Sequence, residues 1–173
     1  DGLAEVIKHG IIADPDLFHL CADGWDRAAS QLPVVVRRGM AVKVKIIEDD
    51  PYEQGSRAVL NLGHTVGHAV ELVSRFSMLH GEAVAVGMVV EAKLAERLSI
   101  ADSGLANMLA EALSGLGLPV EIPRDLPLSE LVTAMKMDKK KSNGAVRFAL
   151  PVKIGEVKAG IEVDELQSVL EEK

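Results

Sequence analysis

The sequence Asn-Leu-Gly-His-Thr-Val-Gly-His-Ala-Val-Glu, residues 61–71, sets two histidines and two glycines in an apolar pattern typical of a helix. We expect this helix to run from 57 to about 76. His64 and His68 are four positions apart, so both rings project from one helix face, one turn apart. A second long helix is predicted at 81–98, and the two helices form the heart of a helical domain.

A glycine precedes each of these histidines, at Gly63 and Gly67. A glycine inside a helix costs about 1 kcal/mol relative to alanine. Two such glycines beside two imidazoles therefore predict that another backbone or a ligand approaches this helix closely.

A third histidine, His80, stands at the start of the second long helix, and Glu5 offers a carboxylate from a first predicted helix. Two imidazoles and one carboxylate, with a position left for water or substrate, are the usual ligands of catalytic Zn²⁺. Taken alone, two histidines four residues apart are more often a polar stripe or satisfied core residues than metal ligands. We interpret His9 and His19 as ordinary surface or packing residues.

The remaining sequence also favours helices. Asp14 followed by Pro15 is typical of an N-cap with proline at the first helical position, which opens a short helix to about Cys21. Further helices are expected at 2–12, 33–48, 103–115, 129–137 and 164–173, although the valine-rich 33–48 also suits a strand. A polar loop is expected at 49–55, and strands at 146–150 and 152–154 with a turn at 154–156. The predicted class is mainly α, a multi-helix domain with a small β-ribbon near the C-terminus.

Composition agrees with this class and limits the function. A chain of 173 residues is long enough for one domain. Hydrophobic residues make up 48% and aromatic residues 3%, a mixture that suits closely packed helices. The net charge of −7 argues against a surface for nucleic acid or for an anionic membrane. Because no apolar run reaches the roughly 20 residues of a membrane span and only one cysteine is present, we expect a soluble, cytoplasmic protein.

Cationic residues accompany the histidines in this otherwise acidic sequence. Arg57 is seven positions before His64 and Asn61 lies between them, so on one continuous helix they share a face with His68. A cation, an amide and two imidazoles on one face suit an anionic, hydroxylated ligand. The other cations are Lys8, Lys43 and the run at 139–141. A run of charges is, however, more often a solvated face.

Four blocks of sequence together resemble the 3-dehydroquinate synthase family in both order and spacing. They are Gly-Leu-Ala-Glu-Val-Ile-Lys at 2–8, the histidine block at 61–71, His-Gly-Glu-Ala-Val at 80–84, and Asp-Lys-Lys at 138–140 with Gly144 beyond. The resemblance extends from the first residues to about residue 155, and its histidine block is far more specific than two histidines alone. It is to the C-terminal, metal- and substrate-binding domain of these enzymes.

The resemblance implies a role for each matching residue. Glu5, His64 and His80 would be the ligands of Zn²⁺ or Co²⁺, which leaves His68 as an acid or base in contact with substrate. Glu53 falls where the family has a proposed proton acceptor. The carboxylate, hydroxyls and phosphate of the substrate would contact Lys8, Lys43, Arg57, Asn61 and either Lys139 or Lys140, with Lys140 preferred.

The implied reaction converts 3-deoxy-D-arabino-heptulosonate 7-phosphate to 3-dehydroquinate and phosphate. It is a lyase reaction of the shikimate pathway to chorismate and the aromatic amino acids. The metal would ease deprotonation of a substrate hydroxyl while NAD⁺ accepts hydride, and the resulting ketone acidifies the neighbouring C–H for loss of phosphate. The hydride is then returned.

The sequence contains no Gly-rich strand–turn–helix fingerprint of a dinucleotide site. We therefore expect residues 1–173 to be a single helical metal- and substrate-binding domain whose N-terminal NAD⁺-binding domain is absent from this chain. The amphipathic opening, without a leader or an initiating methionine, also indicates a fragment. We expect the fragment alone to be inactive and the full-length enzyme to be a homodimer.

Two alternatives to this function stay open. The first is a related enzyme, either another sugar-phosphate cyclase or a metal-dependent alcohol dehydrogenase; the dehydrogenase has no use for the cations Lys8, Arg57 and Lys140. The second is a non-catalytic helical module that a metal stabilises. A structural zinc site usually has four protein ligands, often cysteines, whereas this sequence offers one cysteine and an open three-ligand set.

Overall fold

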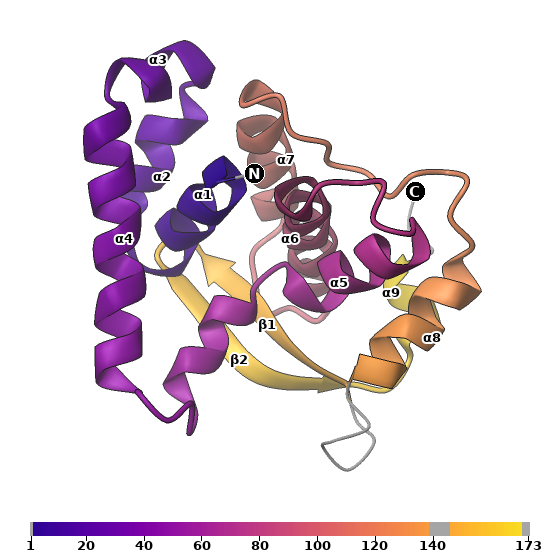
Figure 1. The fold of residues 1–173 in the computed structure, drawn as a ribbon. Helices are drawn as coiled ribbons and strands as arrows, with labels where there is room; N and C mark the ends of the chain where they lie inside the picture. The colour runs from indigo at the N-terminus through magenta and orange to yellow at the C-terminus, as the bar shows by residue number, and fades with distance from the viewer. Residues whose placement is uncertain (1, 139–145, 171–173) are drawn as a thin grey trace.

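The computed structural model describes residues 2–138 and 146–170, which fold into helices and one β-hairpin (Figure 1). In chain order the helical elements are α1 (Gly2–Ala13), α2 (Pro15–Ala22), α3 (Trp25–Ser30), α4 (Leu32–Asp49), the 3₁₀ helix η1 (Ser56–Asn61), α5 (His64–Val73), α6 (His80–Arg97), α7 (Leu105–Gly115), α8 (Leu128–Asp138) and α9 (Leu166–Leu170). The strands are β1 (Val146–Lys153) and β2 (Glu156–Val163). The predicted class, mainly α with a small β-ribbon near the C-terminus, is confirmed.

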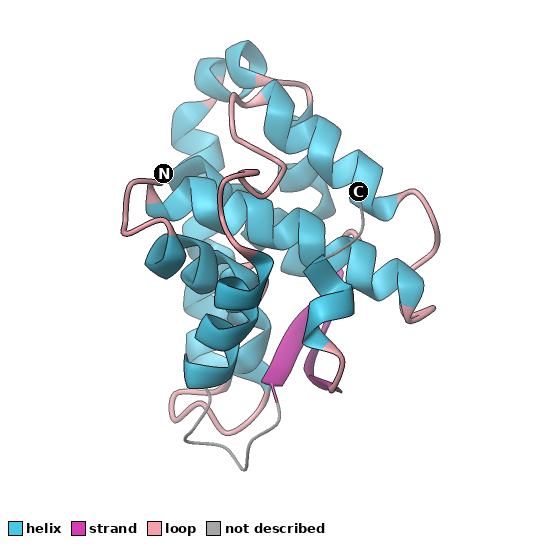
Figure 2. Ribbon diagram, turned by 90° about the vertical axis from the view of Figure 1, so that its right-hand side faces the viewer, coloured by secondary structure: helices cyan, strands magenta, loops and turns pink. Residues whose placement is uncertain are grey.

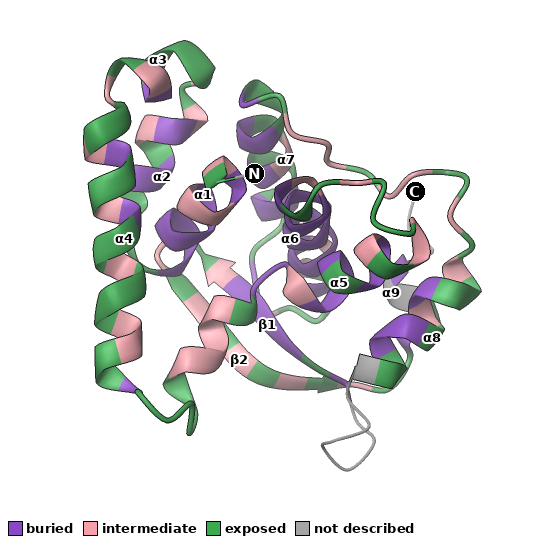
Figure 3. Cartoon of the chain, in the orientation of Figure 1, coloured by how far each residue is buried: buried purple, intermediate pink, exposed green. Residues whose placement is uncertain are grey.

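Helix α6 is the centre of the core. Most of its residues are buried, as Figure 3 shows, and it contacts α1, α5, α7 and β1. Buried side chains of α6 such as Met88 and Leu94 join a single cluster that includes Ile7 and Ile11 of α1. Helix α1 therefore packs directly against the element that begins with His80.

The close approach predicted from the glycines occurs between α5 and α6. A Cβ atom on Gly87 would lie 2.0 Å from the carbonyl oxygen of Gly63. A Cβ on Gly67 would lie 3.1 Å from the carbonyl oxygen of Ala83. Glycine at these positions thus lets the two helix backbones meet, and the meeting brings the first residues of α5 and α6 to one place.

The predicted helix at 57–76 is wrong in its continuity. The chain forms η1, breaks at Leu62 and Gly63, and begins α5 only at His64. Gly63 has φ 79°, a left-handed conformation that favours glycine, and its N–H donates to the buried carboxylate of Glu91 at 2.6 Å. A side-chain acceptor on another helix thus captures the N–H that a continuous helix would have paired internally.

Most other predicted elements agree with the structure. Asp14 caps α2 by accepting the N–H of Leu17 at 3.1 Å, and Pro15 opens that helix. The valine-rich stretch is helical, as α4, because it buries Val35 and Gly39 on one face against its neighbours while Val36 and Val44 are exposed. Helix α3 was not predicted. Its six residues are too few for a clear apolar period.

The β-hairpin packs along one side of the helices (Figure 2). The predicted turn is confirmed: β1 and β2 pair antiparallel, from Val146 opposite Val163 to Lys153 opposite Glu156. The second strand, β2, follows the turn. The two predicted strand segments, 146–150 and 152–154, instead form the single strand β1, apart from Ile154, which lies in the turn. At the turn, Gly155 donates its N–H to the carbonyl of Ile11 at 2.8 Å, which ties the hairpin to the end of α1.

Two further predictions concern the C-terminal part. The terminal helix is present as α9 and ends at Leu170 among the described residues. Lys139 and Lys140, predicted to contact substrate, lie outside the described residues. Within the two described ranges, no helix combines the length and the apolar character required to cross a bilayer.

Candidate metal centre and adjacent cationic pocket

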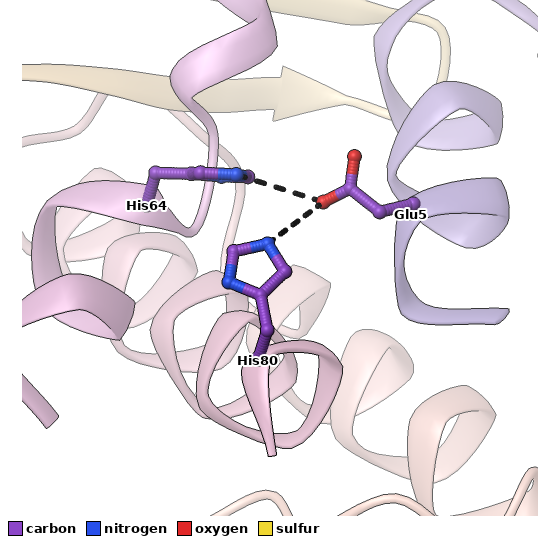
Figure 4. Close-up of side chains that lie close together, drawn as sticks. All are labelled: Glu5, His64 and His80. Atoms are coloured by element: carbon purple, nitrogen blue, oxygen red, sulfur yellow. Dashed lines mark ion pairs between the residues drawn. The ribbon is translucent and has the colours of Figure 1, made fainter. Parts of the chain in front are cut away.

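Three side chains from three helices converge at one point (Figure 4). Glu5 comes from α1, and His64 and His80 are the first residues of α5 and α6. Glu5 Oε1 lies 3.6 Å from Nε2 of His64 and 3.9 Å from Nε2 of His80. One ligand atom from each of the three residues lies within 4.8 Å of the others. The structure thus brings together the three residues predicted to bind a metal.

The two oxygens of Glu5 have different surroundings. Oε2 accepts a hydrogen bond from Lys8 Nζ at 2.8 Å, whereas Oε1 is buried and accepts no hydrogen bond from the described residues. Leaving a buried carboxylate oxygen unsatisfied is costly. A cation placed between Oε1 and the two ring nitrogens would satisfy it, and two imidazoles with one carboxylate fit the preferences of Zn²⁺.

The proton of His64 is held away from this point. Burial, followed by the nearby Lys8 ammonium, lowers the pKa of His64 to about 4, so its ring is neutral at pH 7. Nδ1 lies 3.2 Å from the carbonyl oxygen of Leu62. Because a carbonyl can only accept, Nδ1 carries the single proton and Nε2 presents its lone pair to Glu5. Neutral imidazole with an available lone pair is the form that binds metal.

Glu91 holds the backbone that carries His64. This carboxylate on α6 is fully buried and accepts the N–H of Gly63 at 2.6 Å and that of Val66 at 3.4 Å. Both donors belong to the N-terminal turn of α5, where N–H groups lack partners within the helix and where negative charge is favourable. The sequence analysis missed Glu91, because nothing in an apolar helix pattern shows which backbone a single acidic residue will reach.

A polar cavity of about 270 Å³ opens beside the three converging residues. Its lining contains three cationic side chains, two acidic ones and an amide. The lining residues are Glu5, Lys8, His9, Lys43, Glu53, Arg57, Leu60, Asn61 and His64. The residues predicted to bind the substrate's carboxylate, hydroxyls and phosphate therefore share one cavity across α1, α4 and η1, as far as the structure describes them: Lys8, Lys43, Arg57 and Asn61. His68, predicted to contact substrate as an acid or base, is not part of this lining.

His68 stays one turn from His64 on α5, as predicted, but it does not share a cavity with Arg57 and Asn61. It is exposed, and its ring centroid lies 5.1 Å from that of His64 and 6.1 Å from that of His80. It lines a second cavity of about 280 Å³ beside α8, which includes Thr65 and Met135. The break at Gly63 accounts for this, because η1 and α5 do not share one helical register.

Asp50 shapes the loop that carries Glu53 and Arg57. Its carboxylate accepts the N–H groups of Gln54, Gly55 and Arg57 at 2.8, 2.9 and 3.1 Å. These hydrogen bonds, led by that from Gln54, hold the pKa of Asp50 below its ordinary value. Glu53, inside the same loop, has φ 53°. The loop was predicted from its polar residues, whereas the role of Asp50 was missed because short polar loops all share such residues.

His9 is a packing residue of unusual kind. It is 4% exposed, and neither ring nitrogen has a hydrogen-bond partner among the described residues. Burial, followed by Lys8, lowers the pKa of His9 to about 4. The sequence analysis treated His9 as ordinary; its position four residues after Glu5, one turn along α1, was the available signal.

Fold and site together describe a helical domain built around a candidate metal centre. A sequence model of the family described as 3-dehydroquinate synthase C-terminal matches residues 2–141. The chain belongs to this family.

Curated relatives carry the name 3-dehydroquinate synthase. That of Pyrococcus furiosus is 46% identical over 167 residues, covering 95% of this chain and 48% of the relative. That of Thermodesulfovibrio yellowstonii is 35% identical over 178 residues, covering 99% and 50%. That of a Synechocystis species is 40% identical over 163 residues, covering 90% and 45%. The chain spans about half the length of the curated relatives it matches.

Two solved structures share the fold. One is a 2-epi-5-epi-valiolone synthase from Streptomyces hygroscopicus with NAD⁺ and Zn²⁺ bound, with TM-score 0.84 and 24% identity, covering 98% of this chain and 49% of that one. The other is a 2-deoxy-scyllo-inosose synthase complexed with carbaglucose-6-phosphate, NAD⁺ and Co²⁺, with TM-score 0.81 and 22% identity, covering 97% and 50%.

Proposed function

We propose that this chain is the metal- and substrate-binding half of a 3-dehydroquinate synthase. In that role it serves the conversion of 3-deoxy-D-arabino-heptulosonate 7-phosphate to 3-dehydroquinate and phosphate in the shikimate pathway. NAD⁺ is held mainly by an N-terminal domain that these 173 residues do not contain. The main support for this proposal is the convergence of Glu5, His64 and His80 at the edge of a cavity lined by three cationic side chains.

Glu5, His64 and His80 would hold the divalent cation, for which their oxygen and two nitrogens are suitable donors. When bound, a Zn²⁺ or Co²⁺ ion supplies Lewis-acid chemistry to a substrate oxygen. Lys8 keeps Glu5 ionised: although burial raises the pKa of Glu5, the adjacent ammonium brings it below its ordinary value. The relatives' shared name and the NAD⁺ and Zn²⁺ or Co²⁺ bound by the two fold neighbours support this assignment.

The cavity supplies the recognition of the substrate. Lys43 and Arg57 bring positive charge from α4 and η1 to the same space as Lys8, which suits a phosphate and a carboxylate on one molecule. Asn61 offers an amide to the hydroxyls. Lys140, or Lys139, adds a cation to this set in our proposal. Partly enclosed, such fixed charges act more strongly on an anion than they would in open water.

Two residues would move protons. His68, whose ring centroid lies 5.1 Å from that of His64 and 6.1 Å from that of His80, would act as an acid or base on a substrate bound beside the metal ligands. Glu53 lines the cavity and would accept a proton, with its position set by the loop that Asp50 organises. The full-length enzyme would be a cytoplasmic homodimer.

A zinc titration tests the metal centre. We expect the metal-free chain to take up one Zn²⁺ per chain, and His64→Ala to lose that uptake while keeping its helical circular dichroism. Equal zinc affinity in the two proteins would contradict the assignment of the ligands.

An activity assay tests the reaction. The chain alone should release no phosphate from 3-deoxy-D-arabino-heptulosonate 7-phosphate with NAD⁺ present. Joined to the half of the Pyrococcus furiosus synthase that it does not match, it should do so. Turnover by the chain alone would disprove the proposed need for a second domain. Turnover by the joined protein of a heptulose phosphate without a carboxylate, in place of this substrate, would favour another cyclase, a function suggested by the two fold neighbours.

A further inference from the structure

The ring of His80 lies between two carboxylates, one at each nitrogen. Nε2 is 3.9 Å from Oε1 of Glu5 on α1. Nδ1 is 3.2 Å from both carboxylate oxygens of Glu71, near the end of α5. The side chain of Glu71 is 14% exposed and that of His80 is 44% exposed, so the carboxylate is mostly buried while the ring remains partly open to water. The sequence motifs gave no role to Glu71, although it is the last residue of the block at 61–71.

A neutral imidazole has one N–H, and its neighbours decide which nitrogen carries it. A carboxylate beside Nδ1 accepts a hydrogen bond from an N–H there, which leaves the lone pair on Nε2. His64 has the same arrangement, because its Nδ1 faces the Leu62 carbonyl. Both rings therefore have an acceptor at Nδ1 and direct Nε2 toward Oε1 of Glu5.

We propose that Glu71 is a positioning residue, which holds His80 in its Nδ1–H tautomer and aims Nε2 at the metal position. The proposal rests on the proposed function, in which His80 is a metal ligand. An acceptor behind a ligating histidine fixes the ring and raises its basicity, and its loss typically costs about 10- to 100-fold in metal affinity. Glu71 acts through His80 and does not itself contact the metal.

The main competing role for Glu71 is that of a ligand. His68, Glu71 and His80 also offer three atoms within 4.8 Å of one another, a second set suitable for a cation. The two sets share His80, however. A ring that gives Nε2 to one ion keeps its only proton on Nδ1, and Nδ1 can bind a second ion only by losing that proton. With the Glu5 set occupied, the hydrogen bond to Glu71 is the arrangement that preserves a neutral ring.

Helix α5 carries both a proposed metal ligand and the proposed positioning residue. Glu71 follows His64 by seven residues, two helical turns, so one helix carries a metal ligand and the carboxylate that orients the next ligand. The chain then reverses direction through Arg75 and Phe76, both with positive φ, and returns at His80. The packing of α5 on α6 thereby sets the geometry of both imidazoles.

The test uses the whole 173-residue chain with ¹⁵N-labelled histidine, and Glu71→Ala and Glu71→Gln variants. Long-range ¹⁵N–¹H spectra at about pH 8.5 report the His80 tautomer, and competition with a chromophoric chelator gives the zinc dissociation constant. We expect Nδ1–H in the parent chain, loss of that preference in Glu71→Ala, and zinc binding weakened about 10- to 100-fold. Glu71→Gln, whose amide oxygen still accepts, should lose less. Glu111→Gln, on the exposed face of α7, is the matched control and should change neither readout.

Several outcomes would overturn the proposal. One is an Nε2–H tautomer in the parent chain, and another is an unchanged zinc affinity in Glu71→Ala. A third is two zinc ions per parent chain with one in Glu71→Ala, because Glu71 would then be a ligand. If Glu71→Ala does not fold, the tautomer and affinity of Glu71→Gln decide. A parent chain that binds no zinc would contradict the proposed function instead, a result separate from the comparison of variants.

Discussion

Charge at single residues sets the chemistry of the candidate metal centre. Glu5 divides its two oxygens between Lys8 and the space shared by His64 and His80. The ammonium compensates part of the negative charge and leaves the remaining oxygen to a cation. A neutral amide at this position would keep the size of the side chain but not the charge that draws a divalent ion.

Glu5→Gln tests this charge. We expect zinc binding to weaken by more than about 100-fold, because removing an anionic ligand should exceed the 10- to 100-fold cost typical of changes behind a ligand. Isothermal titration with Zn²⁺ measures it. Glu48→Gln, exposed on α4, is the control with the same change of charge, and an equal loss in both variants would contradict a local role for Glu5.

His9 should make the metal-free chain sensitive to acid. Its pKa is lowered from 6.5 to about 4, so on acidification the unfolded chain takes up a proton before the folded chain does. The contribution of the neutral His9 ring to the free energy of unfolding is therefore fully present above about pH 6.5 and is lost as the pH falls toward 4. At about 1.4 kcal/mol per pKa unit, the loss is up to about 3 kcal/mol.

His9→Leu should reduce this loss between pH 6.5 and 4. Urea unfolding with a chelator present, at a series of pH values, gives the free energies of unfolding. His19→Leu, at an exposed position of α2, should retain the pH dependence of the parent chain. If His9→Leu and the parent show the same slope, the buried ring is not the acid-sensitive group.

At the scale of elements, the junction of α5 with α6 determines the site. Gly63, Gly67 and Gly87 let the backbones meet, and the first residues of both helices are candidate ligands. Because interiors are close-packed, an added methyl group here must push the helices apart. The distance between His64 and His80 would change with them.

Gly87→Ala should therefore damage both stability and metal binding. Its Cβ would lie 2.0 Å from the Gly63 carbonyl oxygen, and we expect a loss of about 3 kcal/mol or more, at or beyond the upper end of overpacking effects. Thermal unfolding and zinc titration measure the two effects. Gly115→Ala, at the end of α7, has no neighbour closer than 3.8 Å and should be neutral or slightly stabilising.

At this junction of α5 and α6, some features could be predicted from the sequence and others could not. The two long helices, their glycines and the start of α6 at His80 follow from apolar period and residue type, and so does the class of the fold. The break at Gly63 does not follow, because it depends on Glu91, which lies 28 residues away in sequence. Arg57 and Asn61 were therefore placed on one helix face, although they meet His64 only in the folded cavity.

The resemblance to a known family predicted more of the candidate site than the apolar period of the helices did. The motif blocks singled out Glu5, His64 and His80 together, and the structure places their ligand atoms side by side. Asp50 lies outside the motif blocks, and Glu71, although it is the last residue of the block at 61–71, was given no role there. Their partners are a loop backbone and a ring on the next helix, contacts that only the tertiary structure defines.

For the whole molecule, the candidate site joins three helices that are distant in sequence. Ligand binding to the folded state alone stabilises it by about 2.7 kcal/mol at a free concentration 100 times the dissociation constant. We therefore expect zinc to raise the melting temperature of the chain, measured by calorimetry against a chelator-treated sample. In Glu5→Gln, zinc should have little effect, and an equal rise in both proteins would mean that the ion binds elsewhere.

Glu5 lies on α1, and α1 rests on α6 and is tied by Gly155 to the hairpin turn. An ion bound to this carboxylate would hold α1 in place. Dissociation of the metal and amide hydrogen exchange along α1 would then require the same local opening of the helix. The lifetime of the bound ion would then depend on how often α1 separates from its neighbours, as well as on the strength of the coordinate bonds.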